Sequence, residues 1–185
     1  MAEFPVHTLE SAPEAARGAL RHLRAAFGMI PHVAGAMAES PVLIDSLVGL
    51  FGQVHGGSFT EAQVQIVLLT DAVTNASAWA VAFHTALALK AGIDAAEVAA
   101  VREGRLPREG KFAALSALAR RMIETRGRVD DADVDRFMEA GFGRAQVLEV
   151  IGIVAASTIT NYTASVTRIP LEAEFRPHAW VRQAK

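Results

Sequence analysis

The sequence predicts an all-α fold of about eight helices, and three observations support this prediction. Apolar residues recur at helical spacing through most of the chain, as at Val64 and Val67. Signatures of helix starts precede such runs at Ser11, Thr60 and Asp94, and glycines follow where the runs end. No segment alternates apolar and polar residues as a half-buried strand does. The chain is therefore expected to form one helical domain over residues 1–185.

The helices can be placed in order along this domain. An extended arm over residues 1–10 precedes helices expected at about 12–27, 32–39 and 41–55. After the central stretch, helices are expected at about 95–103, 111–126, 131–140 and 144–165, before a tail over residues 168–185. Glycine or proline stands at most of the breaks between them, which fits residues that interrupt helices.

The stretch from Thr60 to Leu89 is the longest run without proline or glycine, and it is expected to be helical. Thr60 and Gln63 form a capping-box pattern at its start. Beyond Asn75 the run carries almost no charge, which is typical of a helix buried in a core or an interface. His84 lies in this apolar part, so its ring nitrogens need partners if burial is not to cost stability.

A short internal echo suggests a duplicated helix pair. The tripeptide Ala-Gln-Val opens the central stretch at residues 62–64 and the last predicted helix at residues 145–147. An aliphatic run and then Asn75 or Asn161 follow in each case. This pattern indicates a possible duplication of an antiparallel helix pair.

Composition limits the classes of function. Hydrophobic residues make up 51% of the chain and the mean hydropathy is +0.25, so we expect apolar surface to be buried in a homo-oligomer. A formal net charge of −2 gives no reason to expect nucleic acid or an anionic membrane as a partner. The first twenty residues lack the layout of a signal peptide, so a cytoplasmic location is expected.

Residues 75–84, NASAWAVAFH, carry a motif. They resemble the pattern Asn-x-Cys-x-Tyr/Phe-Cys-x-x-x-His of the alkylhydroperoxidase D / carboxymuconolactone decarboxylase superfamily, with Asn75, Trp79 and His84 in register. The resemblance extends from about residue 27 onward, includes Asn161-Tyr162 and the segments 169–172 and 175–180, and looks like the peroxidase-related branch. It implies an AhpD-like helical bundle that assembles as a trimer or hexamer, with a dimer as the alternative.

The chain departs from this family pattern at the redox residues. Ser77 and Ala80 stand at the two cysteine positions, and Gln65 stands at the position of the family's upstream glutamate. The chain contains no cysteine at all. In the resembled peroxidases a thiolate is the nucleophile and a second thiol resolves the product, and a hydroxyl cannot replace either. We therefore expect no thiol-dependent peroxidase activity.

Four residues remain as candidates for chemistry: His84, Gln65, Ser77 and Glu149. His84 suits acid/base chemistry because the pKa of imidazole lies near neutrality, although a hydrogen-bonded core residue is the alternative. Gln65 is either a polar helper or a buried amide, and Glu149 is either functional or paired. Ser77 lies seven residues before His84, roughly 10 Å along a continuous helix, so these two are not expected to form a hydrolytic dyad.

Two classes of function stay open. One is a cysteine-free enzyme that uses His84 on a small organic acid or lactone-like substrate, and the other is a non-catalytic binding or scaffold protein. No cofactor is expected, and no histidine pair at ligand spacing suggests a metal. Convergence of the four candidates on one cavity would favour the enzyme.

Overall fold

The computed structural model describes residues 3–182, and this part of the chain is all-helical without strands. The predicted fold class is therefore confirmed. Eight of its α-helices have seven residues or more. The elements in order are η1 (Glu14–Ala16), α1 (Arg17–Phe27), α2 (His32–Met37), α3 (Pro41–His55), α4 (Glu61–Thr74), α5 (Ala78–Lys90), α6 (Ala95–Arg102), α7 (Gly110–Thr125), α8 (Asp131–Glu139), α9 (Arg144–Thr167) and η2 (Ala173–His178).

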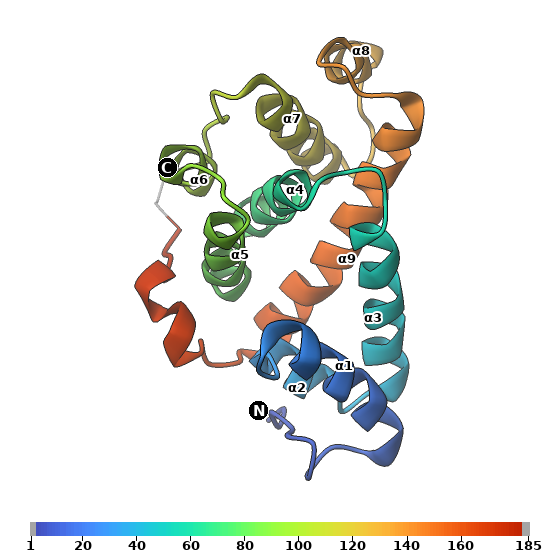
Figure 1. Ribbon diagram of the computed structural model, residues 1–185, viewed down its shortest axis with the longest axis vertical. Coiled ribbons are helices and arrows are strands. Elements are labelled where there is room, and N and C mark those ends of the chain that lie inside the picture. Colours follow the sequence, from blue (N-terminus) through green and yellow to red (C-terminus); the bar gives the residue numbers. More distant parts are fainter. Residues whose placement is uncertain (1–2, 183–185) are drawn as a thin grey trace.

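The central stretch forms two helices, not one. The capping box is present at the start of α4, where Gln63 N donates to Thr60 Oγ1 and Thr60 N donates to Gln63 Oε1. However, α4 ends at Thr74 and α5 begins at Ala78. Ala76 between them has φ 54°, a left-handed conformation that reverses the chain. The expectation of one continuous helix was wrong, and α5 instead folds back against α4 (Figure 1).

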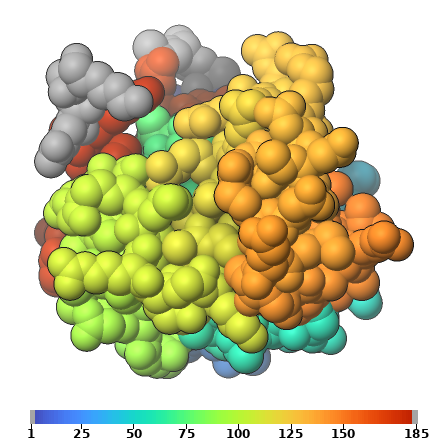
Figure 2. Space-filling view, turned by 90° about the horizontal axis from the view of Figure 1, so that it is seen from above, coloured from blue at the N-terminus to red at the C-terminus, as the bar shows by residue number. Residues whose placement is uncertain are grey.

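The α4 helix lies at the centre of the molecule and is covered by α5, α7 and α9 (Figure 1). Every residue from Val64 to Ala72 is buried. The long α9 packs against both α4 and α5. Helices α2 and α3 also contact α9, and α1 packs against α2 and α3. Figure 2 shows the opposite end, which is covered by residues of α6, α7, α8 and the start of α9.

The segment after α9 is held against α5. Glu172 is buried and accepts hydrogen bonds from Trp79 Nε1 at 2.7 Å and His32 N at 2.6 Å. Farther along, Arg102 donates to the carbonyl oxygen of His178 at 3.0 Å. Phe175 packs edge-on against the Phe83 ring. The predicted tail therefore covers the domain, apart from residues 183–185, which lie outside the described residues, as do residues 1–2 of the predicted arm.

The α9 helix is long and apolar enough to meet a length-and-composition test for a membrane span, with 39% of the window buried inside the molecule. A core helix of a soluble protein meets the same test, and Val150, Ile153 and Ala156 of α9 are buried in the core. The suggested duplication of a helix pair remains a prediction. The two asparagines of the repeated pattern share a hydrogen-bond acceptor, because Asn75 Nδ2 and Asn161 Nδ2 both donate to Asp71 Oδ1.

Candidate functional site

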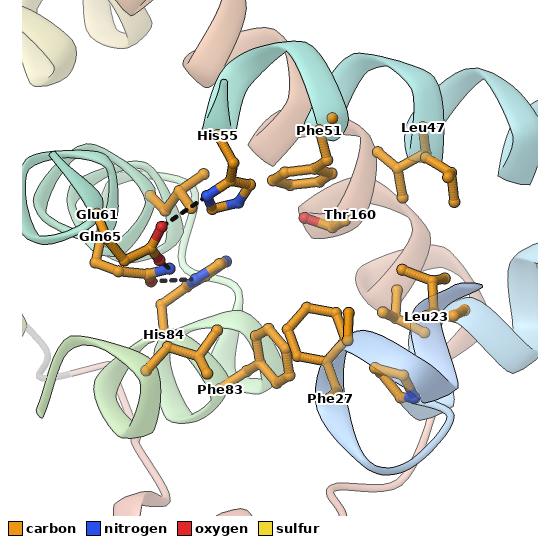
Figure 3. Close-up of a pocket in the computed structure, with 18 of the residues that line it drawn as sticks. Leu23, Phe27, Leu47, Phe51, His55, Glu61, Gln65, Phe83, His84 and Thr160 are labelled. Atoms are coloured by element: carbon orange, nitrogen blue, oxygen red, sulfur yellow. Dashed lines mark hydrogen bonds and ion pairs between the residues drawn. The ribbon is translucent and has the colours of Figure 1, made fainter. Parts of the chain in front are cut away.

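A cavity of about 580 Å³ lies between α1, α2, α3, α4 and α5, with one residue contributed by α9 (Figure 3). This volume is within the range of small-molecule sites. Most of the lining side chains are apolar: Leu23, Phe27, Val33, Leu47, Val48, Phe51, Leu68, Trp79, Phe83 and Leu87. Its titratable lining residues are His22, His55, Glu61, His84 and Lys90. His22 and Lys90 are solvent-exposed, whereas His84 is buried.

One wall of the cavity carries a chain of hydrogen bonds across α3, α4 and α5 (Figure 3). His55 Nδ1 lies 2.8 Å from Glu61 Oε2. Gln65 Nε2 donates to Glu61 Oε1 at 2.7 Å. Gln65 Oε1 lies 3.1 Å from His84 Nδ1. The deepest polar group, His84, is therefore connected through an amide to a carboxylate one helical turn nearer the solvent.

The hydrogen bonds define the tautomer of His84. An ionised carboxylate only accepts hydrogen bonds, so Gln65 must direct its amide NH₂ towards Glu61 and its oxygen towards His84. Because an amide oxygen only accepts, His84 Nδ1 must carry the proton. His84 Nε2 then has a lone pair and makes no hydrogen bond within the described part of the chain. Figure 3 shows this second ring nitrogen directed into the open space.

The surroundings of the two groups favour a neutral His84 and an ionised Glu61. The pKa of His84 is lowered to about 3, mainly by burial and also by the charge of His55, while Glu61 opposes the shift. Hydrogen bonds from His55 and Gln65 lower the pKa of Glu61, although partial burial acts in the opposite direction. At neutral pH the cavity therefore presents an uncharged imidazole, with an ionised carboxylate beyond the amide.

The four predicted candidates do not converge. His84 and Gln65 line the cavity together, but Ser77 and Glu149 are absent from its lining. Ser77 is buried at the N-cap of α5, and its Oγ has no hydrogen-bond partner. Glu149 accepts hydrogen bonds from Ser58 N at 2.9 Å and Ser58 Oγ at 3.0 Å, which tie the α3–α4 loop to α9. Of the four predicted residues, only His84 and Gln65 therefore belong to the cavity.

Sequence reasoning missed Glu61 and His55. His55 precedes a glycine-rich turn, and an acidic residue in the first turn of a helix, such as Glu61, already stabilises the helix N-terminus, so neither residue stands out in the sequence. The one usable signal was the spacing of Glu61 and Gln65, four residues apart and hence on one face of α4. The His55–Glu61 contact needs the geometry of the α3–α4 connection, which residue spacing does not provide.

A second buried polar cluster lies between α4 and α9, outside the cavity. Asp71 is fully buried, and its Oδ1 accepts from Asn75 and Asn161. Its Oδ2 and the Oδ1 of Asn161 lack hydrogen-bond partners. Burial raises the pKa of Asp71 to about 7 despite these hydrogen bonds. The protonation state of Asp71 therefore changes near neutral pH, which makes this cluster a source of pH-dependent stability.

The described residues contain no group of three or more His, Cys, Asp or Glu side chains placed to hold a metal ion. The cavity likewise has no cluster of cationic side chains at its buried end, since Lys90 and His22 are both exposed. The buried polar groups that line the cavity are the neutral imidazole of His84, the amide of Gln65 and the hydroxyl of Thr160, within an apolar enclosure.

Comparison with known proteins supports the sequence resemblance. Residues 45–120 match the model of the Carboxymuconolactone decarboxylase family. This segment contains α4 and α5 with the Glu61–Gln65–His84 wall. The predicted resemblance is therefore confirmed over this segment, which contains no cysteine. No curated protein matches the chain.

Solved structures share the fold over nearly the whole chain. An uncharacterized peroxidase-related protein from Ralstonia eutropha JMP134, described as an alkylhydroperoxidase AhpD core, superposes with a TM-score of 0.83 at 18% identity, covering 98% of this chain and 97% of that chain. A peroxidase-related protein from Silicibacter sp. TM1040 has a TM-score of 0.78 at 15% identity over 94% and 95% of the two chains. A cysteine-to-alanine variant of the debrominase Bmp8 in complex with 2,3,4-tribromopyrrole has a TM-score of 0.77 at 15% identity over 96% of each chain. The molecule therefore has the AhpD-type fold.

Proposed function

We propose that the protein is a cysteine-free enzyme of this fold that uses His84 for acid/base chemistry on a small, largely apolar organic acid or lactone-like substrate. One observation carries the proposal: His84 lines a cavity of about 580 Å³ with its Nδ1 held by Gln65, an arrangement that leaves the lone pair on Nε2. A neutral imidazole positioned in this way accepts a proton from a bound substrate. The ligand in the debrominase complex is also a small ring, comparable in size to a lactone.

The proposed step is a proton transfer that needs no redox partner. A C–H bond next to a substrate carbonyl breaks, the proton moves to His84 Nε2, and the electron pair stays on the substrate as an enolate. The proton then returns from Nε2 to the same carbon or to another. In the empty cavity the pKa of His84 is about 3, so the imidazole is a weak base. The negative charge that develops on the substrate beside it favours the imidazolium form.

A second candidate is a non-catalytic binding protein, and the amide of Gln65 favours it. In the resembled family a glutamate stands at this position, where a carboxylate can take up a proton. Gln65 separates His84 from Glu61 by an amide that does not exchange protons readily at neutral pH. Under this alternative the hydrogen-bond chain serves only to position His84 towards a ligand.

Proton nuclear magnetic resonance in heavy water separates the two candidates. A panel of small lactones, lactone acids and keto acids is incubated with the protein, and loss of the signal of the hydrogen next to the carbonyl is followed. For at least one compound we expect exchange that falls about 10²-fold or more in His84→Gln. His7→Gln is the matched control, because His7 lies outside the cavity and contacts Glu39. Binding without any exchange would support the non-catalytic candidate.

We also propose a cytoplasmic location and a homo-oligomeric assembly for this function. The apolar, cysteine-free composition supports both, since such a chain needs no oxidising compartment and has apolar surface to bury.

A further inference from the structure

We propose that the cavity selects neutral ligands of single-ring size that carry an O–H or N–H donor, and that it discriminates against carboxylates of the same size. The inference rests on the proposed role of His84 as the group that meets the substrate. It narrows the proposed substrates to uncharged, lactone-like rings that carry such a donor, and it excludes an organic acid whose carboxylate would face His84.

The first argument is the direction of the hydrogen-bond chain. Glu61 accepts from Gln65, and Gln65 accepts from His84, so every proton in the chain points towards the carboxylate. The lone pair of His84 Nε2 is what remains at the cavity end. A hydroxyl or N–H group completes this chain with a hydrogen bond. A carboxylate oxygen would instead oppose a lone pair, because it has no proton to give.

The second argument is charge. A carboxylate bound against His84 would lie in mostly apolar surroundings, and no cation among the described residues lies at the buried end of the cavity to pair with it. Glu61 adds little repulsion, because its side chain is half exposed and contacts His55, but an unpaired charge in an apolar enclosure is itself unfavourable. The cations of the lining are Lys90 and, when protonated, His22 and His55. Lys90 and His22 are exposed to solvent, so an ion pair with either contributes little.

The third argument is the shape of the apolar part. The Phe51 ring lies across the open space from Phe83 and Phe27, with Leu23 and Leu47 closing the side away from His84 (Figure 3). Phe27 packs edge-on against Phe83, with ring centroids 5.4 Å apart, and this contact fixes one wall. A ring placed between these walls gains contact on both faces. Its polar substituent is then left to meet His84.

The test compares three ligands that share one ring and differ at a single substituent. Dissociation constants are measured by calorimetry for p-cresol, p-xylene and p-toluate. We expect p-cresol to bind about tenfold more tightly than p-xylene, as one added hydrogen bond to a buried acceptor predicts. We expect p-toluate to bind most weakly. An affinity for p-toluate equal to that for p-cresol, or no advantage of p-cresol over p-xylene, would overturn the inference.

A charge-conserving double variant provides the internal control. Glu61→Gln combined with Gln65→Glu keeps the net charge and moves the carboxylate next to His84 Nδ1. A direct carboxylate partner raises the pKa of the imidazole and favours a proton on Nε2, which turns this atom into a donor. We expect the preference for p-cresol over p-toluate to shrink at least tenfold. An unchanged preference in a variant with normal helicity would contradict the inference.

A measurement without ligand keeps the inference testable if the double variant does not fold. Long-range ¹H–¹⁵N spectra of the wild-type protein are expected to show His84 protonated at Nδ1 and unprotonated at Nε2 at pH 7. The opposite tautomer would overturn the inference. Failure of the inference is distinguishable from failure of the proposed function. If the three ligands rank in another order but hydrogen exchange still depends on His84, only the inference is refuted. If none of the three ring ligands binds and no exchange occurs, both are refuted.

Discussion

At the scale of single residues, polar groups in this molecule are placed by the partners that burial demands. His84 is buried and has Gln65 as its partner, as the need to satisfy a buried ring predicts. The contact was foreseeable because few polar residues share the apolar stretch. Glu61 was not foreseeable as part of the site, since an acidic residue in the first turn of a helix usually has a sufficient explanation there.

Asp71 gives a prediction at this scale. Its folded-state pKa of about 7 lies above the ordinary value of 3.8, so its contribution to stability is complete below about pH 4 and is lost as the pH rises through 7. Asp71→Asn keeps an acceptor for Asn75 and Asn161 and removes the charge. We expect the variant to be more stable than the wild type at pH 8, by about 1–3 kcal/mol, measured by urea unfolding.

The same unfolding experiment at pH 5 is the control for Asp71→Asn. The two proteins should differ less at this pH, because the wild-type carboxyl is then mostly protonated in the folded state. A wild type more stable than the variant at pH 8 would show that Asp71 is ionised and well paired.

At the scale of helices, the sequence predicted most starts and ends but not the hairpin between α4 and α5. Capping residues predicted the start of α4 at Thr60, and glycines such as Gly92 and Gly104 marked the ends of others. The turn at residues 75–77 contains neither glycine nor proline. Its left-handed residue is Ala76, which local preference alone does not predict. Packing of two apolar helices against each other outweighs this local cost.

The segment after α9 gives a prediction at the scale of elements. Glu172 accepts from Trp79 and His32, and thereby fixes this segment to two helices. In Glu172→Gln, one of the two donors faces an amide NH₂ instead of an oxygen. We expect a loss of about 1.5–3 kcal/mol in unfolding free energy. Hydrogen–deuterium exchange over residues 169–182 should increase, whereas Glu174→Gln, at an exposed position of the same segment, should change neither quantity.

At the scale of the whole molecule, α9 exposes large apolar side chains on its outer face. They are Leu148, Ile151, Tyr162 and Val166, each at least half exposed. We expect this face to contact a second copy of the chain, because an apolar helix face of this length is unfavourable in water. Light scattering should show an oligomer at micromolar concentration, and Ile151→Lys should shift it towards monomer.

Val42→Lys is the matched control for that experiment. Val42 is also exposed and apolar, but it lies on α3. A monomeric wild type would contradict the expected assembly. If only Val42→Lys dissociated the oligomer, the interface would lie at α3 and not at α9.

The composition of the whole chain leads to a further prediction about reactivity. Without a single cysteine, the protein has neither a thiolate nucleophile nor a resolving thiol. We expect no reduction of an alkyl hydroperoxide coupled to a dithiol donor, measured as peroxide consumption with metal-free protein. Turnover that persists in the metal-free protein would require another nucleophile and would contradict this expectation.

The three residues between α4 and α5 determine how the cavity tolerates mutation. Gln65 and His84 are 19 positions apart, which is about 28 Å along an unbroken helix, yet the reversal at residues 75–77 places them in hydrogen-bond contact. If one residue were added to this turn and α5 still began at the same point in space, each side chain of α5 would shift by one position, which is a rotation of about 100° about the helix axis. His84 would then point away from the cavity. We therefore expect a change in the length of this turn to displace His84 more than a substitution at Ala76 does. Among related sequences that keep this cavity, the number of residues in the turn should vary less than their identity.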